Sequence, residues 1–509
     1  MTQNKGTKEK LSNVRVRMAP SPTGLMHIGT LRTVLYDYLF ARQNGGKLIL
    51  RIEDTDQSRE VEGAVENLLG MLTWAGLEPD EGPQINADGE MIEVGEYGPY
   101  TQSKRLEIYQ EHVGKLIDAG HAYHCFCTPE RLDEMRKVQQ KMKQPTMYDR
   151  TCCGLELADV LARIDAGEKY VIRMKVPRGE GVIVDDVVRG RVSFQTDIVD
   201  DQVIMKSDGF PTYHLAVVVD DHLMGITHIF RGEEWLPSTP KHIILYKMFG
   251  WDVPVFAHLP LLLGSDGKKK LSKRDGDVSV EDFIKEGYLR EAIINFVVFL
   301  GWNPGGGETR EIYSLDELEE VFQLEKVHKA GAVLDRVKLG KINAHYIKAL
   351  SDDELYARGK DFFDTAINAL YPEWSPVDRV GMTQRIMAVE KDRLEKLTDF
   401  GKDNPFFFVE NEVDPALLRW KEQADDETKA ALEMAREVLS SVEEDAWTRT
   451  ELEKILMQAA GEDRGSFLWP LRAALTSAKR SPSPMDCAWV LGKEESQKRI
   501  GAAIASLTI

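Results

Sequence analysis

A histidine at a Pro/Gly turn is the first residue whose type and place indicate chemistry. The stretch APSPTGLMHIGT, residues 19–30, follows a strand pattern and precedes a helical one. A ligand at the carboxyl end of a strand can lie beside the next helix N-terminus, and Gly24 and Gly29 would let the backbone approach it. His27 stands just before that helix, where its ring can donate a hydrogen bond to a phosphate. A capping turn with a partly buried histidine is the alternative interpretation.

Lysines in a second stretch offer positive charge. The sequence has neither a P-loop nor a GxGxxG after its first strand pattern, so a nucleotide would need another device. In GKKKLSKR, residues 267–274, several lysines occupy a glycine-flanked loop. Such a loop suits the charge that develops as pyrophosphate leaves an α-phosphate. An exposed, solvated basic loop is the alternative.

Acidic residues form the third group. RIEDTDQSR, residues 51–59, places Glu53, Asp54 and Asp56 at the end of the second strand pattern. These carboxylates would lie at the same edge as His27 and could hold a substrate amino group. Equally, they could cap the next helix, which begins nearby.

The elements that must position these residues follow from the apolar periodicity. Residues 14–18 predict a strand, and apolar residues at 31, 34, 35, 38 and 39 predict one face of a helix that ends at the glycine pair 45–46. Residues 47–52 predict a second strand and 61–77 a second helix. This order predicts a βαβ unit with parallel strands.

The rest of the chain changes character twice. Residues 121–210 read as an insertion that includes antiparallel strands at 182–194, after which the α/β pattern resumes. From about 310 the strand signal fades into amphipathic helices. We therefore expect a helical C-terminal half in two parts.

The composition is that of a globular protein, with 509 residues of which 42% are hydrophobic and 29% charged. Length alone suggests roughly three domains. No apolar run is long enough to span a bilayer and the N-terminus lacks a secretion signal, so no membrane partner is expected. The net charge of −19 argues against a protein coated in nucleic acid, but basic clusters at 267–274 and 477–484 leave local RNA binding open.

The cysteines do not indicate disulfides. Four of the five lie between positions 125 and 153, which is not a disulfide framework in a chain of this length. We therefore expect a reducing, cytoplasmic compartment. Cys487 stands alone and is expected in the core.

Six stretches, in order, resemble the signatures of class I aminoacyl-tRNA synthetases in the form typical of glutamyl-tRNA synthetases. They are RMAPSPTGLMHIGTLRT (17–33), RIEDTDQSR (51–59), YTQSKR (100–105), FPTYHLAVVVDDHLMGITHIFRGEEW (210–235), KLSKR (270–274) and LWPLRAALTSAKRSP (468–482). The resemblance covers nearly the whole chain. Thr30 stands where many class I enzymes have a second histidine, and glutamyl enzymes commonly carry a small or hydroxyl residue there.

The resemblance implies an architecture and a reaction. It implies an α/β Rossmann-type catalytic domain (1–120 and 211–310), an inserted α+β connective domain that binds the tRNA acceptor end (121–210), a helical stem-contact domain (311–380) and a helical anticodon-binding domain (381–509). It also implies a monomer that uses ATP and Mg²⁺ to form glutamyl-adenylate from L-glutamate and then charges the 3′-terminal adenosine of tRNA-Glu. Attack by an already ionised carboxylate needs no general base, so catalysis should be positioning and charge stabilisation.

The resemblance also assigns residues. For catalysis it implies His27, Lys270, Ser272 and Lys273, and for ATP binding His27, Gly29, Glu234 and Lys273. For glutamate binding it implies Arg17, Ala19, Ser21, Glu53, Tyr213 and Arg231. The arginines suit the side-chain carboxylate and Glu53 suits the α-ammonium group.

The cysteines look like the zinc-bearing version of the family's insertion, whose pattern is CxC…YxxxCxH. Cys125, Cys127 and Cys152 match it, but Gly154 replaces the expected histidine. Tetrahedral zinc would therefore need Cys153, Tyr148 or His124 as its fourth ligand. Packing of small cysteines in the core of a vestigial site is the alternative.

Three other functions compete with this prediction. A paralogue that charges a modified base would lack the long helical C-terminal half, and a small-molecule nucleotidylyltransferase would not explain residues 51–59 or 210–235. A non-catalytic zinc and RNA-binding module would have no need for both His27 and the lysines of 270–274.

Overall fold

The computed structural model describes residues 11–507 except 57–59, 272–277, 371–375 and 410–411. The chain divides into two compact units. The N-terminal unit comprises Met1–Phe283 with Ile293–Asp335, and the C-terminal unit comprises Ile284–Ala292 with Arg336–Ile509. No helix of the described ranges is long and apolar enough to cross a membrane.

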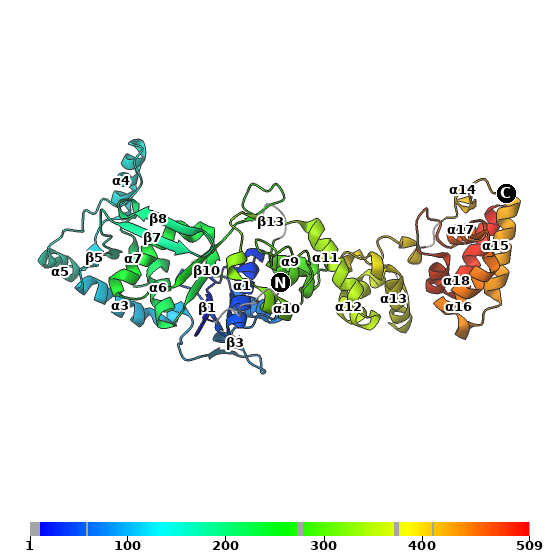
Figure 1. Ribbon diagram of the computed structural model, residues 1–509, viewed down its shortest axis with the longest axis horizontal. Helices are drawn as coiled ribbons and strands as arrows, with labels where there is room; N and C mark the ends of the chain where they lie inside the picture. Colours follow the sequence, from blue (N-terminus) through cyan, green and yellow to red (C-terminus); the bar gives the residue numbers. More distant parts are fainter. Residues whose placement is uncertain (1–10, 57–59, 272–277, 371–375, 410–411, 508–509) are drawn as a thin grey trace, which may run out of the picture. The chain divides into compact units, whose positions relative to one another are not determined.

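The N-terminal unit begins with the expected βαβ arrangement (Figure 1). Strands β1 (Arg15–Met18) and β2 (Lys47–Leu50) pair in parallel, with helix α1 (Ile28–Asn44) between them in sequence. The helix ends at Gly45, whose φ of 65° lies in the left-handed region that glycine adopts most readily. Because α1 is also buried beyond its predicted apolar face, including at Tyr36 and Phe40, it is a core helix rather than a surface helix.

A four-stranded sheet forms the centre of this unit. Its order is β10 (His228–Gly232), β11 (Val255–Leu259), β7 (Gly181–Asp186) and β8 (Gly190–Gln195). β11 is parallel to both of its neighbours, whereas β7 and β8 form the antiparallel pair that the sequence predicted. Strands from 121–210 and from 211–310 thus share one sheet.

The other elements of the N-terminal unit surround these sheets. A hairpin, β3 (Gly82–Ile85) and β4 (Met91–Val94), and a sheet of order β5-β6-β9 (Ala122–Cys125, Val171–Met174, Val203–Met205) lie in its first part. The helices are α2 (Ala64–Ala75), α3 (Leu106–Asp118), α4 (Pro129–Lys141), α5 (Leu157–Asp165), α6 (Tyr213–Leu223), α7 (Thr239–Phe249) and α10 (Leu315–Val321). The two-residue strands β12 (Leu262–Leu263) and β13 (Ala332–Val333) pair in parallel.

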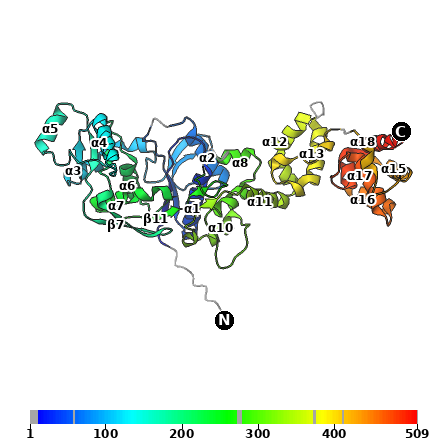
Figure 2. The same cartoon turned by 90° about the horizontal axis from the view of Figure 1, so that it is seen from above.

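The described part of the C-terminal unit contains helices and no strand, as expected for this half. Helices α8 (Val280–Lys285) and α9 (Arg290–Val298) carry the chain between the units. The helices that follow are α11 (Arg336–Ala349), α12 (Asp352–Leu370), α13 (Pro376–Glu390), α14 (Pro415–Leu418), α15 (Asp425–Ser440), α16 (Arg449–Ala460), α17 (Arg464–Thr476) and α18 (Pro484–Ser506). Helices α15 to α18 pack together as one bundle (Figure 1 and Figure 2), with Cys487 fully buried in it as expected.

Candidate active site

The residues predicted for catalysis and substrate binding meet at one cavity of about 940 Å³ in the N-terminal unit. Every described residue predicted for catalysis, ATP or glutamate lines it. These residues come from β1 and the turn after it, the start of α1, the segment after β2, α6, β10 with the short 3-10 helix that follows it, and the segment after β12. These residues are Arg17, Ala19, Ser21, His27, Gly29, Glu53, Tyr213, Arg231, Glu234 and Lys270. Ser272 and Lys273 lie outside the described residues.

His27 is held by the turn that the sequence predicted. It is the N-cap of α1, and its Nδ1 accepts a hydrogen bond of 2.9 Å from the backbone N–H of Gly29. A neutral imidazole with an accepting Nδ1 carries its proton on Nε2, which therefore acts as a donor. A Cβ on Gly29 would lie only 3.1 Å from that Nδ1, so the glycine permits this geometry.

Arg231 is a buried cation with neutral neighbours. Its side chain is 7% exposed and contacts nitrogen or hydroxyl acceptors, none of them charged: His258 Nε2 (3.0 Å), Tyr213 Oη (3.2 Å), His242 Nδ1 (3.3 Å) and Thr239 Oγ1 (2.8 Å). No carboxylate within the described ranges pairs with it. Burial lowers the pKa of Arg231. A buried, uncompensated charge at the wall of a cavity favours an anionic ligand.

Arg17 is held differently, by an ion pair. Its Nε lies 3.2 Å from Asp221, which also binds Arg51 at 2.8 Å. Arg51 in turn lies 3.1 Å from Glu53, and all four side chains are buried. Burial raises the pKa of Glu53, and the neighbouring Arg51 counteracts it only in part. This chain of charges fixes one cation and one anion at the cavity wall.

Lys270, predicted for catalysis, pairs with Glu234, predicted for ATP binding. Lys270 Nζ lies 2.6 Å from Glu234 Oε1, and both side chains are well exposed. The backbone N–H of Leu271 donates to Leu262, which anchors the loop base at the cavity. The cation and the anion are therefore ready to exchange this contact for one with a ligand.

Sequence reasoning missed the residues that hold these side chains. Asp221 belongs to an acidic pair inside the apolar run AVVVDD, which is the signal that could have identified a buried ion pair. His258 and His242 are likewise buried histidines in apolar segments, VFAHLPL and HIILY. A buried polar side chain needs a hydrogen-bond partner, so each of these three residues indicated a buried polar network.

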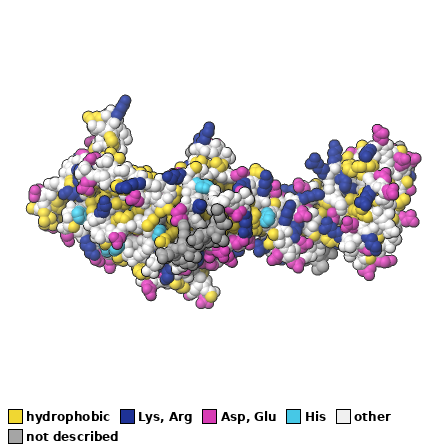
Figure 3. Space-filling model, in the orientation of Figure 1, with side chains coloured by type: hydrophobic (Ala, Val, Ile, Leu, Met, Phe, Trp, Pro, Cys, Tyr) yellow, Lys and Arg dark blue, Asp and Glu magenta, His cyan; other side chains and the backbone are white. Residues whose placement is uncertain are grey.

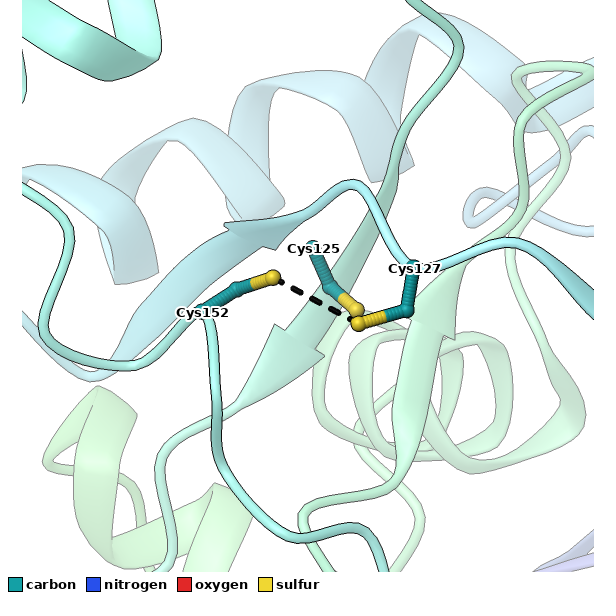
Figure 4. A group of neighbouring side chains, drawn as sticks. All are labelled: Cys125, Cys127 and Cys152. Carbon is teal, nitrogen blue, oxygen red and sulfur yellow. Dashed lines mark hydrogen bonds between the residues drawn. The ribbon is translucent and has the colours of Figure 1, made fainter. Parts of the chain in front are cut away.

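Three of the four cysteines come together at the end of β5 (Figure 4). The sulfurs of Cys125, Cys127 and Cys152 lie within 4.8 Å of one another, with 3.6 Å between the last two. The Tyr148 hydroxyl lies 3.4 Å from the first sulfur and 3.2 Å from the second. Cys153 does not join them, because its sulfur contacts Arg150 at 3.7 Å.

A second cavity, of about 550 Å³, lies in the C-terminal unit. Its lining includes one carboxylate, Asp403, and four cations, from the 477–484 cluster and elsewhere: Arg393, Arg472, Lys479 and Arg480. The Arg472 guanidinium donates to the carbonyl of Ala478 and the hydroxyl of Ser481, which fixes the loop. Figure 3 shows several Lys and Arg side chains close together on the visible face of this unit, beside acidic ones.

Comparisons with known proteins agree with this arrangement. The family described as tRNA synthetases class I (E and Q), catalytic domain, matches residues 13–341, and the anticodon binding domain family matches 354–504. A glutamate–tRNA ligase of Finegoldia magna is 44% identical over 97% of this chain and 100% of its own, and one of Alkaliphilus metalliredigens is 46% identical over 96% and 98%. The crystal structure of a glutamate tRNA ligase from Elizabethkingia meningosepticum, in complex with its amino acid, superimposes with a TM-score of 0.85 at 37% identity, over 97% of this chain and 100% of that one.

Proposed function

The chain belongs to the class I tRNA synthetases of the glutamate and glutamine type and is a glutamate–tRNA ligase, and from this premise we propose how its cavities serve the reaction. L-Glutamate and ATP meet in the cavity of the N-terminal unit. The observation that carries this assignment is Arg231, a buried cation that contacts only neutral groups among the described residues, at a wall shared with His27.

Glutamate lies with its side-chain carboxylate against Arg231. The Tyr213 hydroxyl accepts from that guanidinium, which leaves its own O–H to donate to the same carboxylate. Arg17 adds a second cation, while Glu53 takes the α-ammonium group. Ala19 and Ser21 complete the lining.

ATP lies between the His27 turn and the 270–274 loop. The Nε2–H of His27 and the ammonium group of Lys273 contact the phosphates, and Lys270 and Ser272 shape the loop that carries Lys273. The glutamate α-carboxylate attacks the α-phosphorus, the bond to the β-phosphate oxygen breaks and pyrophosphate leaves. Mg²⁺ bound with ATP supplies further charge neutralisation. A ribose hydroxyl of the tRNA 3′ adenosine then attacks the activated carbonyl and AMP leaves.

The remaining parts serve the tRNA. Residues 121–210 contact the acceptor end, 311–380 the stem and 381–509 the anticodon loop. The second cavity suits an anionic, single-stranded loop because Arg393, Arg472, Lys479 and Arg480 line it. We also propose a monomer, as the resemblance implies, and a cytoplasmic location, which the free cysteines support.

Zinc at the cysteine cluster is the last part of the proposal. Tetrahedral zinc with Zn–S bonds of about 2.3 Å places two sulfurs about 3.8 Å apart. The 3.6 Å between Cys127 and Cys152 fits this edge. Tyr148 is the fourth ligand that the contacts favour over Cys153 or His124. The ion would be structural, joining β5 to the loop that carries Cys152.

Charging of tRNA-Glu and tRNA-Gln, side by side with ATP and Mg²⁺, tests the site. We expect Arg231→Gln to raise the KM for glutamate about 10- to 150-fold, since hydrogen bonds to a charged group contribute about 1.5–3 kcal/mol. Arg42→Gln is the matched control, because Arg42 pairs with Asp80 outside the cavity. An unchanged glutamate KM in the Arg231 variant contradicts its assignment.

The tRNA specificity is a separate outcome of the charging experiment. Charging of tRNA-Glu alone identifies a discriminating ligase, and charging of both tRNAs identifies a non-discriminating one.

A further inference from the structure

Three residues form a relay across neighbouring strands behind the glutamate pocket. Arg231 on β10 stands directly opposite His258 on β11, and Asp186 ends β7 on the other side of β11. The Nε–H of Arg231 donates to His258 Nε2 at 3.0 Å. On the far side of the ring, His258 Nδ1 lies 2.6 Å from Asp186 Oδ2. All three side chains are buried.

These contacts fix the proton on the imidazole. A guanidinium has only donors, so Nε2 of His258 must accept, and the ring proton sits on Nδ1, where Asp186 accepts it. Burial lowers the pKa of His258, which keeps the ring neutral. A buried carboxylate beside one ring nitrogen is a known way of holding an imidazole in one tautomer and orientation.

A second histidine repeats the pattern on α7. His242 Nδ1 accepts from Arg231, and its Nε2 lies 3.0 Å from His214 Nδ1. Burial holds the pKa of His242 well below its usual value and lowers that of His214 to about 3. Both rings are therefore neutral at neutral pH, and the Nε2–H of His242 donates to Nδ1 of His214.

Neutral hydrogen-bond acceptors have a physical advantage over carboxylates as partners of Arg231. A carboxylate on Arg231 would fix the guanidinium but would also neutralise it, and the substrate carboxylate would have to compete with it. An imidazole fixes the geometry and leaves the charge available. The carboxylate of Asp186 contacts His258 and not Arg231, so it orients the imidazole without neutralising the guanidinium.

We propose that Asp186 and His258 are positioning residues for glutamate, which hold Arg231 with a neutral acceptor so that its charge is kept for the substrate side chain. The proposal rests on the role of Arg231 given above. Asp186 lies in 121–210, outside the stretches that resemble the family signatures, and does not line the cavity.

Asp186→Asn is the sharpest test, because it changes one donor and almost no volume. Oδ1 of Asp186 accepts the backbone N–H groups of Val188 (3.0 Å) and Arg189 (2.7 Å), so the amide oxygen will stay there. The NH₂ will replace Oδ2, which faces both the His258 ring and the His258 backbone N–H (3.1 Å). The ring proton must then move to Nε2, which faces Arg231 and the Thr239 hydroxyl (3.1 Å). We expect the glutamate KM to rise about tenfold or more with tRNA-Glu present, while the ATP KM stays within about twofold.

His258→Gln provides an independent variant. The glutamine oxygen can accept from Arg231 without any help from Asp186. We expect His258→Gln to keep the glutamate KM closer to wild type than His258→Leu does, and Asp186→Asn to add nothing in the His258→Gln background. Asp201→Asn is the control for loss of a buried carboxylate in the same segment, which binds Tyr123, the Val176 N–H and two arginines, Arg150 and Arg178, instead.

The outcomes separate the two levels of the argument. If Arg231→Gln leaves the glutamate KM unchanged, the proposed site is wrong. If it raises that KM while Asp186→Asn does not, only the relay is wrong. Equal rises in the glutamate and ATP KM values, or an effect matched by Asp201→Asn, would mark a structural role and overturn the proposal. ¹⁵N spectra of His258 should show a protonated Nδ1 in the wild type.

Discussion

We propose two tasks for the two ring nitrogens of His27. Nδ1 caps α1 by accepting from Gly29, and in the proposed reaction the Nε2–H donates to ATP in the cavity that His27 lines. Capping contributes to stability, whereas the donor contributes to the transition state, so the two tasks can be separated by substitution.

His27→Asn should separate them. The asparagine Oδ1 occupies nearly the place of Nδ1 and is a preferred N-cap, so the free energy of unfolding should stay within about 0.5 kcal/mol of wild type. The donor is lost, and kcat for charging should fall about 100-fold or more. His27→Ala should lose both, with about 1 kcal/mol of stability. Denaturant unfolding and charging kinetics measure the two effects; equal stability of the two variants would refute the capping role.

At this scale, motifs predicted which residues would face the substrate but not which ones hold them. Arg17, His27 and Arg231 lie in contiguous signatures, and each lines the cavity. Asp186 and His258 are 72 positions apart, and only the pairing of their strands brings them together. The proposed fourth metal ligand could not be predicted from the sequence either. Cys153 follows Cys152 in the chain, but this does not determine where the Cys153 side chain points.

The cysteine cluster lies where β5 meets the loop that carries Tyr148 and Cys152. Helix α4, between Cys127 and Tyr148, has no buried residue and packs the partly buried Leu132 and Met135 against this cluster, so the core of this part of 121–210 is small. A metal there would contribute directly to its folding.

We expect the purified protein to contain about one zinc ion per chain. Cys152→Ser should lose it, Tyr148→Phe should weaken it, and Cys153→Ser should retain it, because Cys153 contacts Arg150 instead. Metal content by atomic emission measures this. Reduced protein from zinc-rich growth that carries no metal would contradict the proposal, and a metal-free Cys153→Ser variant would contradict the ligand set.

The elements themselves were largely predictable from periodicity. The strand–helix–strand start, the 182–194 hairpin and the helical C-terminal half all appear. The second helix begins at Ala64 rather than 61, because Gly63 adopts a φ of 78° as its N-cap. The pairing of β7 with β11 could not be predicted, since a strand pattern shows which face is buried but not which strand lies beside it.

Charge is distributed unevenly over the protein. The net charge of −19 would repel RNA, yet Arg393, Arg472, Lys479 and Arg480 gather at one cavity. Binding depends on such local clusters and on the counterions they displace, and not on the total.

Lys479→Ala and Arg480→Ala should therefore raise the KM for tRNA and leave the KM values for ATP and glutamate unchanged. Each should also lower the slope of log affinity against log salt by about one. Lys454→Ala is the control, since this exposed lysine of the same unit pairs with Glu451 away from the cavity. The same slope change in the control would refute a specific RNA site.

The pairing of β7 with β11 also limits how this enzyme can be recombined with its relatives. Helices α4 and α5 precede β6, so their segments can be exchanged without moving β7. Deleting a single residue within β7, before Asp186, is different, because it would shift the register of the strand and turn the side chains on one side of the deletion to the opposite face. A hybrid with such a junction would keep all the family signatures and still lose its preference for glutamate. The choice of crossover points for such hybrids is therefore limited by the register of β7, although β7 lies outside the residues proposed to contact the amino acid.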